Sequence, residues 1–510
     1  MQLVKPILFA SLGILGITFA SPPSHPTASP KKKVPTFASD VAPIIYSKCA
    51  GCHHEGEVAP FTLTSYRDAK AKALTIAAVV KQKYMPPWSA ESHGQFTNER
   101  TLSADQIATI SAWANAGAPA GNLAKAPAAP SFVKGWRMGT PEFVGQPTAP
   151  YPVAADGADD YRCFVIPTNY PGDRYVTGVE VRPGNSRIVH HVLVYLDAHH
   201  LARKILSKDG KPGFESFGGP GFPPSGSLGG WAPGLDPEIL PSGLGYLLPK
   251  GADIVVQVHY HKDGKPETDL TKIGLKFTTV PVDKRLRSEA VGDEGFVIPA
   301  GAKDFPVQAS MTLNRDVTVL NVIPHMHLLG KDMKVVATLP DGEKKDLITV
   351  DHYDYNWQTR YAYKTPIKLP SGTQISMVAH YDNSTDNLRN PNSPPKQVTF
   401  GEHTTDEMCF AFFTFTLDSE HLISGKSGGD EDNASDHKSE LISIFSRFDT
   451  NKDGFLDENE LAALISNFDG SDKTKSLQQA KMAISFFGKA VKGKVNQDEF
   501  MKMVAATSKS

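Results

Sequence analysis

In Arg187-Ile-Val-His-His-Val-Leu-Val-Tyr-Leu196, apolar and β-branched residues follow one another in a short run, and Ile254-Val-Val-Gln-Val-His-Tyr260 repeats this composition. Glycine and proline separate many such runs between residues 151 and 420. Short runs of this kind with turn residues between them are typical of an all-β sandwich. The sequence therefore predicts that residues 151–420 fold into β-sheets.

An internal echo predicts that this β-region holds two domains of one kind. Val258-His-Tyr-His-Lys-Asp263 follows Leu248-Pro-Lys-Gly251, and Ala379-His-Tyr-Asp-Asn383 follows Leu369-Pro-Ser-Gly372 in the same way. We therefore expect two jelly-roll-like domains that meet near residue 285. They span residues 151–284 and 285–423.

Histidine and methionine gather in this region in a pattern suited to metal. The residues are His190, His191, His259, His325, His327 and Met408. Imidazole suits both oxidation states of copper and a thioether favours Cu(I), whereas zinc has no use for the methionine. A single histidine or methionine on an apolar strand is usually a packed core residue. Several histidine-bearing segments are harder to explain in that way, so the sequence predicts two separate mononuclear copper sites.

Strand geometry restricts how these histidines reach a metal. In His325-Met-His327 the two side chains of an extended chain point to one face, about 7 Å apart at Cα, which suits one ion. His190 and His191 are consecutive, so a regular strand would point them to opposite faces. Both can bind the same metal only if the strand is bulged or ends there.

Four motifs lie in the β-region, namely Gly229-Gly-Trp-Ala-Pro-Gly234, Val256-Gln-Val-His-Tyr260, Pro324-His-Met-His-Leu-Leu-Gly-Lys331 and Asp406-Glu-Met-Cys-Phe410. They resemble, in the same order, motifs of the copper type II, ascorbate-dependent monooxygenases. Peptidylglycine α-hydroxylating monooxygenase and dopamine β-monooxygenase belong to that family. The resemblance covers about residues 155–420.

This resemblance implies an enzyme that uses O₂ and a reductant to hydroxylate a C–H bond of a small organic substrate. His190, His191 and His259 look like the electron-transfer copper site, and His325, His327 and Met408 look like the site that binds and reduces O₂. Each turnover needs two electrons, which two one-electron coppers can store. The donor would be an ascorbate-like reductant or a redox protein.

Two histidines and two substitutions qualify this resemblance. His261 lies on the strand face of His259, and His380 is its echo in the second domain, so both stay open as ligands. Peptide-amidating members carry an Arg two residues before the His-x-His and a Tyr four residues after the methionine, where this chain has Ile323 and Phe412. A C-terminal glycine is therefore a poor substrate, and an apolar or aromatic substrate fits better.

A haem attachment motif precedes the β-region. Cys49-Ala-Gly-Cys-His53 is C-x-x-C-H, in which two thiols bind the haem vinyl groups and the histidine binds iron. A zinc site would need a second cysteine pair, and a redox motif does not need the histidine. We expect a small all-α cytochrome c domain over residues 36–121. Helical patterns occupy Phe37–Tyr46, Asp68–Lys83 and Ser103–Trp113.

The second axial ligand of this haem is expected to be Met85 in Tyr84-Met-Pro-Pro-Trp88. A methionine held by prolines is typical of the class I cytochromes c, which this block resembles, and such a ligand raises the haem potential. His54 and His93 are the alternatives.

The ends and linkers of the chain indicate export. Residues 1–20 have Lys5, an apolar run and small residues before Ser21, which is the pattern of a signal peptide. Linkers follow at residues 122–150 and 424–436. No later stretch is long and apolar enough for a stable membrane span. With a net charge of −2, nucleic acid is excluded as a partner. We expect a secreted or periplasmic protein.

The last block, residues 437–507, is predicted to be an all-α EF-hand domain. The loop Asp449–Glu460 has its Gly at position six, and its calcium ligands are Asp449, Asn451, Asp453, Phe455, Asp457 and Glu460. A second loop at residues 488–499 lacks several ligands, so it pairs with the first without binding Ca²⁺. Because calcium is abundant outside cells, a structural ion is favoured over a sensor.

Two questions stay open in the sequence. Cys163 and Cys409 can form a disulfide or remain buried thiols, because spacing does not show whether they approach each other. The alternative function is a non-catalytic copper and haem electron carrier. A methionine-bearing copper site speaks for the enzyme, because a carrier has no need of an open O₂ site.

Overall fold

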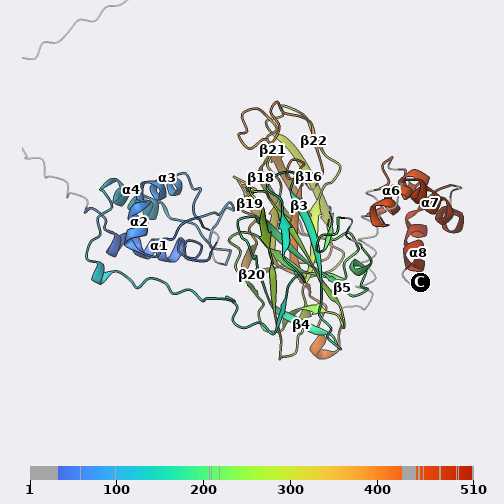
Figure 1. Ribbon diagram of the computed structural model, residues 1–510, viewed down its shortest axis with the longest axis horizontal. Coiled ribbons are helices and arrows are strands. Elements are labelled where there is room, and N and C mark those ends of the chain that lie inside the picture. The colour runs from blue at the N-terminus through green and yellow to red at the C-terminus, as the bar shows by residue number, and fades with distance from the viewer. Residues whose placement is uncertain are drawn as a thin grey trace, which may run out of the picture.

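The computed structural model describes residues 33–57, 59–97, 99–205, 207, 209–216, 219–401, 403–427, 444–445, 448–451, 453–469, 473–489, 491 and 493–507. A helical block comes first, a large body of β-sheets follows, and a small group of helices comes last (Figure 1). The described chain is mostly β-structure, in agreement with the expectation for residues 151–420. The expected signal peptide, residues 1–20, lies outside the described residues, as does most of the linker 424–436.

The helical block packs around Phe37, Ile45 and Trp113, which are almost fully buried. Its helices are η1 (Phe37–Val41), α1 (Ala42–Lys48), α2 (Tyr66–Ala71), α3 (Ala73–Lys81) and α4 (Ala104–Asn115), and η2 (Leu123–Lys125) follows. Ser103 and Gln106 form a capping box at the start of α4. The single helix expected over Asp68–Lys83 is instead two helices, because Lys72 leaves helical geometry between them (φ −115°, ψ 10°).

The N-terminal half of the β-body consists of two main sheets. One has the order β6-β3-β10-β5-β7, and the other has the order β1-β12-β4-β9-β13 with β8 against β4. Their bounds are β1 Phe143–Gly145, β3 Asp160–Pro167, β4 Arg174–Arg182, β5 Val189–Asp197, β6 Phe214–Glu215, β7 Gly226–Trp231, β8 Glu238–Ile239, β9 Leu244–Leu248, β10 Asp253–Tyr260, β12 Lys272–Phe277 and β13 Lys284–Arg285. β2 (Tyr151–Val153) pairs with β11 (Glu267–Asp269), and η3 is Ala202–Lys204. β10 is the centre of its sheet and is buried along its whole length.

The C-terminal half also consists of two sheets, with the orders β14-β23-β17-β20 and β16-β21-β18-β19. Their bounds are β14 Arg287–Gly292, β16 Phe305–Thr312, β17 Val317–His325, β18 Gly330–Thr338, β19 Lys344–Val350, β20 Tyr361–Leu369, β21 Gln374–Tyr381 and β23 Phe410–Leu417. β15 (Val297–Ile298) pairs with β22 (Val398–Thr399), and η4 is Leu422–Ser424. The chain changes halves between Arg285 and Arg287, next to the junction expected near residue 285.

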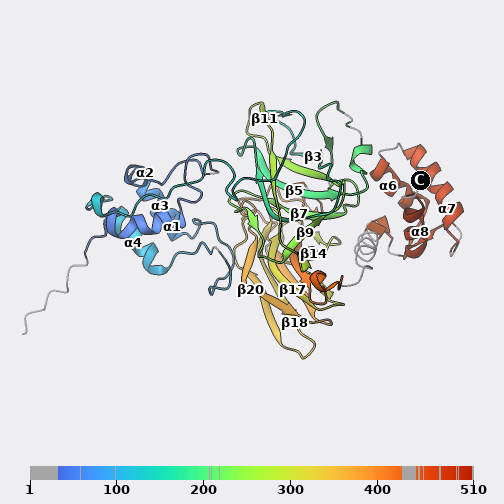
Figure 2. The ribbon, with the colours of Figure 1, turned by 90° about the horizontal axis from the view of Figure 1, so that it is seen from below.

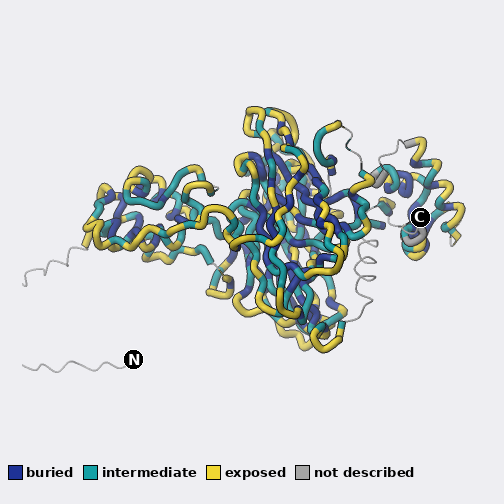
Figure 3. Tube along the Cα trace, turned by 60° about the horizontal axis from the view of Figure 1, so that its bottom comes forward, coloured by how far each residue is buried: buried dark blue, intermediate teal, exposed yellow. Residues whose placement is uncertain are grey.

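The two halves lie against each other, and the helical block contacts one side of the β-body (Figure 2). Buried residues run through the interior of each half, whereas exposed residues gather at the turns (Figure 3). The N-terminal core includes Val192, Ile254 and Val258, and the C-terminal core includes Val335 and Tyr381. Both cores are apolar, as the β-rich sequence runs require.

The two cysteines of the β-body are buried in separate places. Cys163 packs on β3 with Phe214 and Val255, and Cys409 lies in the core of the C-terminal half. They form no disulfide with each other.

The last described segment has the helices α6 (Glu458–Asp469), α7 (Lys473–Phe487) and α8 (Gln497–Thr507). β24 (Phe455–Leu456) pairs with β25 (Val495–Asn496), so the two loops predicted from the sequence are joined. Phe445, Leu461 and Phe500 are buried in the core of this segment. Ala490 and Lys492 of the second loop lie outside the described residues. Across the described ranges, no helix has both the length and the apolar character needed to cross a bilayer.

Candidate metal centre

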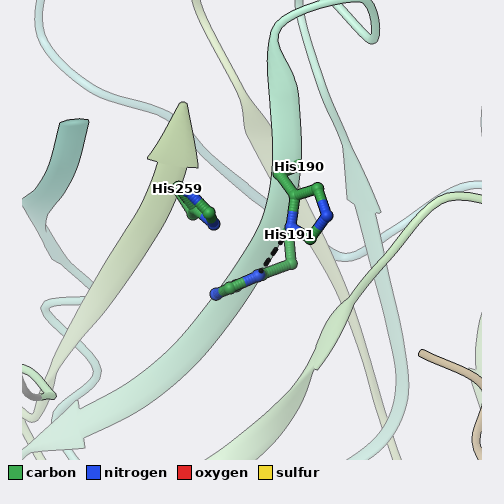
Figure 4. A group of neighbouring side chains, drawn as sticks. All are labelled: His190, His191 and His259. Atoms are coloured by element: carbon green, nitrogen blue, oxygen red, sulfur yellow. Dashed lines mark hydrogen bonds between the residues drawn. The ribbon is translucent and has the colours of Figure 1, made fainter. Parts of the chain in front are cut away.

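Three histidines of the N-terminal half converge on one point. His190 and His191 lie on β5 and His259 lies on the neighbouring β10, and each offers a ring nitrogen within 4.8 Å of the others (Figure 4). The strand irregularity expected at this place is present: His259 pairs with His191 while Tyr260 pairs with Val189, so His190 is an extra residue in β5. The bulge turns both consecutive imidazoles toward His259.

The donor atoms of this cluster fit a metal ion. Nδ1 of His190 and Nδ1 of His191 lie 3.2 Å apart. This agrees with the separation of about 3.3 Å expected for two nitrogens that bind one metal at about 2.0–2.1 Å. Nε2 of His259 donates to the Asp159 carboxylate at 2.8 Å. Its Nδ1 therefore carries the lone pair, and this atom is buried without a partner. A carboxylate that fixes a ligand histidine in this way is common at metal sites.

The second cluster lies at the end of a strand in the C-terminal half. His325 ends β17, His327 follows it, and Met408 precedes β23. Nε2 of His325 lies 3.2 Å from Sδ of Met408, and the two imidazole centroids are 5.4 Å apart. Nδ1 of His325 donates to Oε1 of Gln358 at 3.1 Å, and Nδ1 of His327 donates to the Asp406 carbonyl at 3.1 Å. Both Nε2 atoms therefore keep their lone pairs for a metal.

These imidazoles are neutral at physiological pH. Burial, helped by neighbouring histidines, lowers the pKa of His190 to about 3 and that of His327 also to about 3. Burial lowers the pKa of His325 to about 4 and holds that of His191 well below its usual value. A neutral imidazole is the form that binds metal, so the donors are in the state that copper requires.

Glu407 joins the segment that carries Met408 to the segment that carries His327. Its carboxylate accepts the backbone N–H of His327 at 2.8 Å and that of Leu329 at 2.6 Å. Complete burial raises the pKa of Glu407 to about 8. The Tyr381 hydroxyl donates to the Met408 carbonyl at 2.7 Å. The sequence does not predict these two roles, although Glu407 stands inside the Asp406-Glu-Met-Cys motif.

Tyr355 lies between the two clusters. Its ring stacks on His190 with centroids 4.6 Å apart and meets the His327 ring edge-on at 5.5 Å. Its hydroxyl lies 3.3 Å from Oγ1 of Thr404, which donates to Asp159 at 2.8 Å. The ligands of both clusters are thus joined through one tyrosine and one carboxylate. No motif marks Tyr355, so only the fold reveals it.

The two alternative histidines differ in position. The His261 ring lies 6.4 Å from that of His190, and its Nδ1 is buried without a partner, so it borders the first cluster. His380 lies on β21 and pairs with Asp332 at 2.6 Å. It contacts neither cluster among the contacts of the described residues, so the histidine that corresponds to His259 in the second domain pairs with a carboxylate outside both clusters.

Apolar side chains form a shelf beside His325. Ile323 opposes Phe412 and His325 opposes Phe410 across β17 and β23, so all four share one face. The Phe412 ring lies 6.1 Å from the His325 ring, and its side chain is 39% exposed. Phe410 lies 5.6 Å from Phe412. This Phe410–Phe412–Ile323 shelf leaves an apolar surface open next to a candidate ligand.

The C-x-x-C-H residues lie at the end of α1 in the helical block. Nδ1 of His53 donates to the Phe61 carbonyl at 3.0 Å, which leaves Nε2 for iron. Burial raises the pKa of the Cys49 thiol to about 12, so Cys49 is no reactive thiolate, and Cys52 shifts in the same direction. His54 stacks on Phe132 at 3.6 Å, while Met85 is half-buried and His93 is exposed. Cys49, Cys52 and His53 thus have the donor chemistry that a covalently attached haem would need.

The first calcium loop has the shape of an EF-hand. Asp449 accepts the N–H groups of Asp453 and Gly454, and Glu460 accepts those of Thr450 and Asp457. Gly454 has φ +81°, which glycine adopts without strain. Lys494 of the second loop forms an ion pair with Asp453. These contacts hold the loop by its own backbone, and Asp449, Asp453 and Glu460 are the carboxylates that would bind a Ca²⁺ ion there.

Residues 291–431 match the family described as "Copper type II ascorbate-dependent monooxygenase, C-terminal domain", and residues 440–470 match "EF-hand domain". No curated protein gives a significant match. The chain is similar to the infectious bursal disease virus VP2 subviral particle, with 9% identity over 68% of this chain and 94% of that chain and a TM-score of 0.15. It is also similar to PBCV-1 VP54 fitted into the virophage Sputnik, with 9% identity over 57% and 98% and a TM-score of 0.21. Scores this low carry no argument about fold or function.

The matched copper domain contains His325, His327 and Met408. The resemblance inferred from the motifs is thereby confirmed for the C-terminal half, and the EF-hand is confirmed as well. The chain is a copper-dependent oxidoreductase that uses O₂. The haem block, the ligand assignments and the N-terminal copper site stay predictions.

Proposed function

We propose that this copper-dependent oxidoreductase is a secreted monooxygenase that hydroxylates a C–H bond of a small apolar or aromatic substrate. His325, His327 and Met408 hold the copper at which O₂ is used, and His190, His191 and His259 hold the copper that stores an electron. One observation carries the proposal: each cluster consists of neutral imidazoles that are partly or fully buried, and a hydrogen bond at the second nitrogen fixes the ring in His259, His325 and His327.

Copper bound at these places would supply one-electron redox chemistry and the activation of O₂. The surrounding chain keeps the donors in position. Gln358 and the Asp406 carbonyl fix the tautomers of His325 and His327, and Glu407 ties the turn after β17 to the segment that carries Met408. A rigid donor set of this kind can hold copper in both oxidation states without large rearrangement.

The apolar shelf is the proposed substrate surface. Phe412 and Phe410 offer ring faces beside His325, and Ile323 stands where the peptide-amidating enzymes have an arginine. None of the three shelf side chains is charged, so the shelf itself offers no cation to a substrate carboxylate. An aromatic or aliphatic substrate would bury apolar area against the shelf and bring a C–H bond close to the His325 cluster.

We propose further that a haem c, attached to Cys49 and Cys52 with His53 and Met85 as axial ligands, passes electrons to the first copper. The helical block contacts the N-terminal half near that site: Arg100 donates to the Gly234 carbonyl at 2.5 Å and lies 3.6 Å from Asp236. Trp231, from the same segment as Gly234, opposes Val192 across the sheet, next to His191. Through β7, the helical block is thus connected to β5, the strand that carries His191.

A cavity of about 100 Å³ lies at this contact, and its lining includes Gly56 and Glu57 from the haem-motif loop and Trp231 from β7. Arg137 pairs with Glu57 at 4.0 Å and with Asp236. The helical block and the β-body belong to one chain, so the local concentration of the proposed haem donor at its copper acceptor is high. It supports delivery within one molecule, in place of or beside a free ascorbate-like reductant.

To test the relay, the protein is reduced without oxygen and mixed with O₂ and substrate in a stopped-flow instrument. Haem oxidation is expected to keep pace with product formation and to lose its catalytic phase in His191→Ala. A haem that stays reduced while product forms on ascorbate would rule the relay out.

The calcium loop is proposed to hold a structural ion, because the two loops are already joined by β24 and β25. Secretion to the periplasm or the cell exterior is proposed from the signal-like start of the chain and from the C-x-x-C-H motif. The physiological substrate is to be found by screening.

The alternative remains a copper and haem electron carrier, and one experiment separates the two. The copper-loaded, reduced protein is mixed with O₂ and a panel of apolar metabolites, and O₂ uptake is followed together with products heavier by one oxygen atom. The enzyme is expected to consume O₂ faster with its substrate, and His325→Ala is expected to abolish this. A carrier would be reoxidised at the same rate with every compound and form no product.

A further inference from the structure

A segment of the helical block leaves that block and joins the C-terminal half. This arm, residues 88–97, makes strand-like hydrogen bonds with two strands of different sheets. The Glu91 N–H donates to the Thr349 carbonyl at 2.8 Å near the end of β19. The Thr97 N–H donates to the Ala362 carbonyl at 2.8 Å, and the Lys364 N–H donates to the Gln95 carbonyl at 2.9 Å, both on β20. The arm therefore spans the open edge between the two sheets.

Apolar side chains of the arm complete the core of the C-terminal half. Phe96 is 0% exposed, and its ring centroid lies 5.4 Å from that of Tyr361 and 5.5 Å from that of Tyr363. Trp88 meets the Tyr361 ring edge-on at 5.0 Å. Ala90 is also buried and pairs with Val350. These contacts place residues of the helical block inside a core otherwise made of residues from the C-terminal half.

The arm holds both ends of one loop. Loop 351–360 connects Val350, the last residue of β19, with Tyr361, the first residue of β20. Val350 pairs with Ala90, and Tyr361 packs against Trp88 and Phe96. A loop fixed at both ends by the same segment has fewer ways to move than a loop fixed by its own strands alone.

This loop carries two side chains that touch the candidate ligands. Tyr355 stacks on His190 at 4.6 Å and meets His327 at 5.5 Å. Gln358 accepts from Nδ1 of His325 at 3.1 Å. The path from arm to site therefore has two steps, each consisting of direct contacts between named residues.

We propose that the arm, through Phe96 and Trp88, is a brace that positions Tyr355 and Gln358 against the histidines of both clusters. Phe96 and Trp88 are positioning residues, because they act through loop 351–360. The metal-related part of this inference rests on the proposed function, whereas the bracing itself does not. It also gives the helical block a structural role in the copper centre that is independent of haem. Met85, the predicted haem ligand, stands just before the arm in the chain.

The first test measures hydrogen exchange in the full-length protein without added copper. Phe96→Ala is expected to speed amide exchange in loop 351–360 by about tenfold or more, while β5 and β10 keep their protection. Leu74→Ala is the matched control, since Leu74 is 69% exposed on α3 of the same block. Unchanged exchange in the loop of Phe96→Ala would overturn the proposal. Phe96→Leu, with a smaller loss of volume, gives the same test with a smaller shift if Phe96→Ala fails to fold.

The second test reads the metal environment rather than activity. In copper-loaded protein, Phe96→Ala is expected to change the Cu(II) electron paramagnetic resonance spectrum. In a Gln358→Ala, Tyr355→Ala background the same substitution is expected to add no further change, because the brace acts through these two residues. Equal spectral changes in both backgrounds would overturn this step. If the protein binds no copper, the proposed function fails while the exchange result still decides whether the brace exists.

Discussion

The ring of Tyr355 lies flat against the ring of His190, with centroids 4.6 Å apart and planes inclined by 16°. Tyr355 belongs to the C-terminal half and His190 to the N-terminal half. The Asp159 carboxylate strengthens this contact, because it accepts from His259 in one half and from Thr404 in the other. The two histidine clusters are therefore connected by side-chain contacts across the interface between the halves.

Removal of the thioether tests the assignment of the O₂ site. Met408→Ala is expected to lower O₂-dependent turnover by more than about 100-fold while the protein still folds and keeps the predicted haem. His380→Ala is the control, since His380 pairs with Asp332 and is expected to leave turnover intact. O₂ uptake and product mass are the measurements. The reverse result, with Met408→Ala active and His380→Ala inactive, would show that the ligand choice was wrong.

A second experiment tests whether His259 or the nearby His261 is the copper ligand. His259→Ala is expected to reduce bound copper from about two ions per chain to about one, because it removes one of the three histidines whose ring nitrogens lie within 4.8 Å of one another. His261→Ala is expected to keep both ions. Asp159→Asn should weaken copper binding at this cluster about 10- to 100-fold, as loss of a ligand's partner does. Metal analysis after dialysis gives the answer, and copper loss in His261→Ala would reassign the ligand.

The ion pairs of Glu420, at the junction of the halves, are expected to make the free energy of unfolding depend on pH. Its fully buried carboxylate accepts from Arg285 at 2.6 Å and from Arg287 at 3.1 Å. Burial alone would raise its pKa, but the arginines hold the pKa below its usual value. The unfolded chain therefore binds the proton more readily, so the stabilisation is complete above about pH 4.5 and is lost as pH falls through the lower folded value.

Glu420→Gln is expected to reduce the free energy of unfolding by about 2–3 kcal/mol at pH 7, because it leaves two arginines without their buried anion. The difference from the unmodified protein should shrink as pH falls below about 4. Denaturant unfolding at several pH values measures it. A difference that does not change with pH would contradict the charge argument.

The ion pair between Lys494 and Asp453 competes with calcium for one carboxylate. Lys494→Met is expected to raise calcium affinity by about two- to fivefold, which is the range for an exposed pair. Glu460→Gln should abolish tight binding, because it removes the ligand at position twelve. Calorimetric titration with Ca²⁺ measures both. Unchanged affinity in Lys494→Met would show that the pair is absent in solution.

The haem prediction depends on the two thiols. Cys49→Ser with Cys52→Ser is expected to abolish covalent haem, whereas Cys163→Ser should keep it, because Cys163 packs far along the chain in the β-body. Haem that stays with the denatured chain is measured by its absorbance after acid extraction. Covalent haem in the double variant would refute the attachment site.

Much of this architecture follows from local sequence. Alternating and β-branched runs predict the strands, and Ser103 predicts the start of α4, because these signals act over a few residues. The consecutive histidines even predict the bulge in β5, since two ligands on one metal require it. The break at Lys72 has no such signal, and there tertiary packing outweighs helical propensity.

The site is less predictable where it depends on long-range contacts. Tyr355 and Asp159 stand in unremarkable segments, yet the fold brings them to His190 and His259. The arm is a similar case, because Trp88 and Phe96 look like ordinary loop residues until β19 and β20 are in place. Spacing identifies donor types, whereas the groups that hold the donors depend on which strands become neighbours.

The arm has a consequence for the order in which the chain is made. Ribosomes release the helical block long before they complete β20, and domains generally fold as they emerge. The apolar side chains of Phe96 and Trp88 therefore stay exposed to solvent until Tyr361 and Tyr363 are synthesised and can pack against them. During this interval the segment is exposed to self-association and to chaperones. A chain in which another segment replaced the helical block would not expose these two side chains. Its C-terminal core would, however, contain a cavity at the place of Phe96.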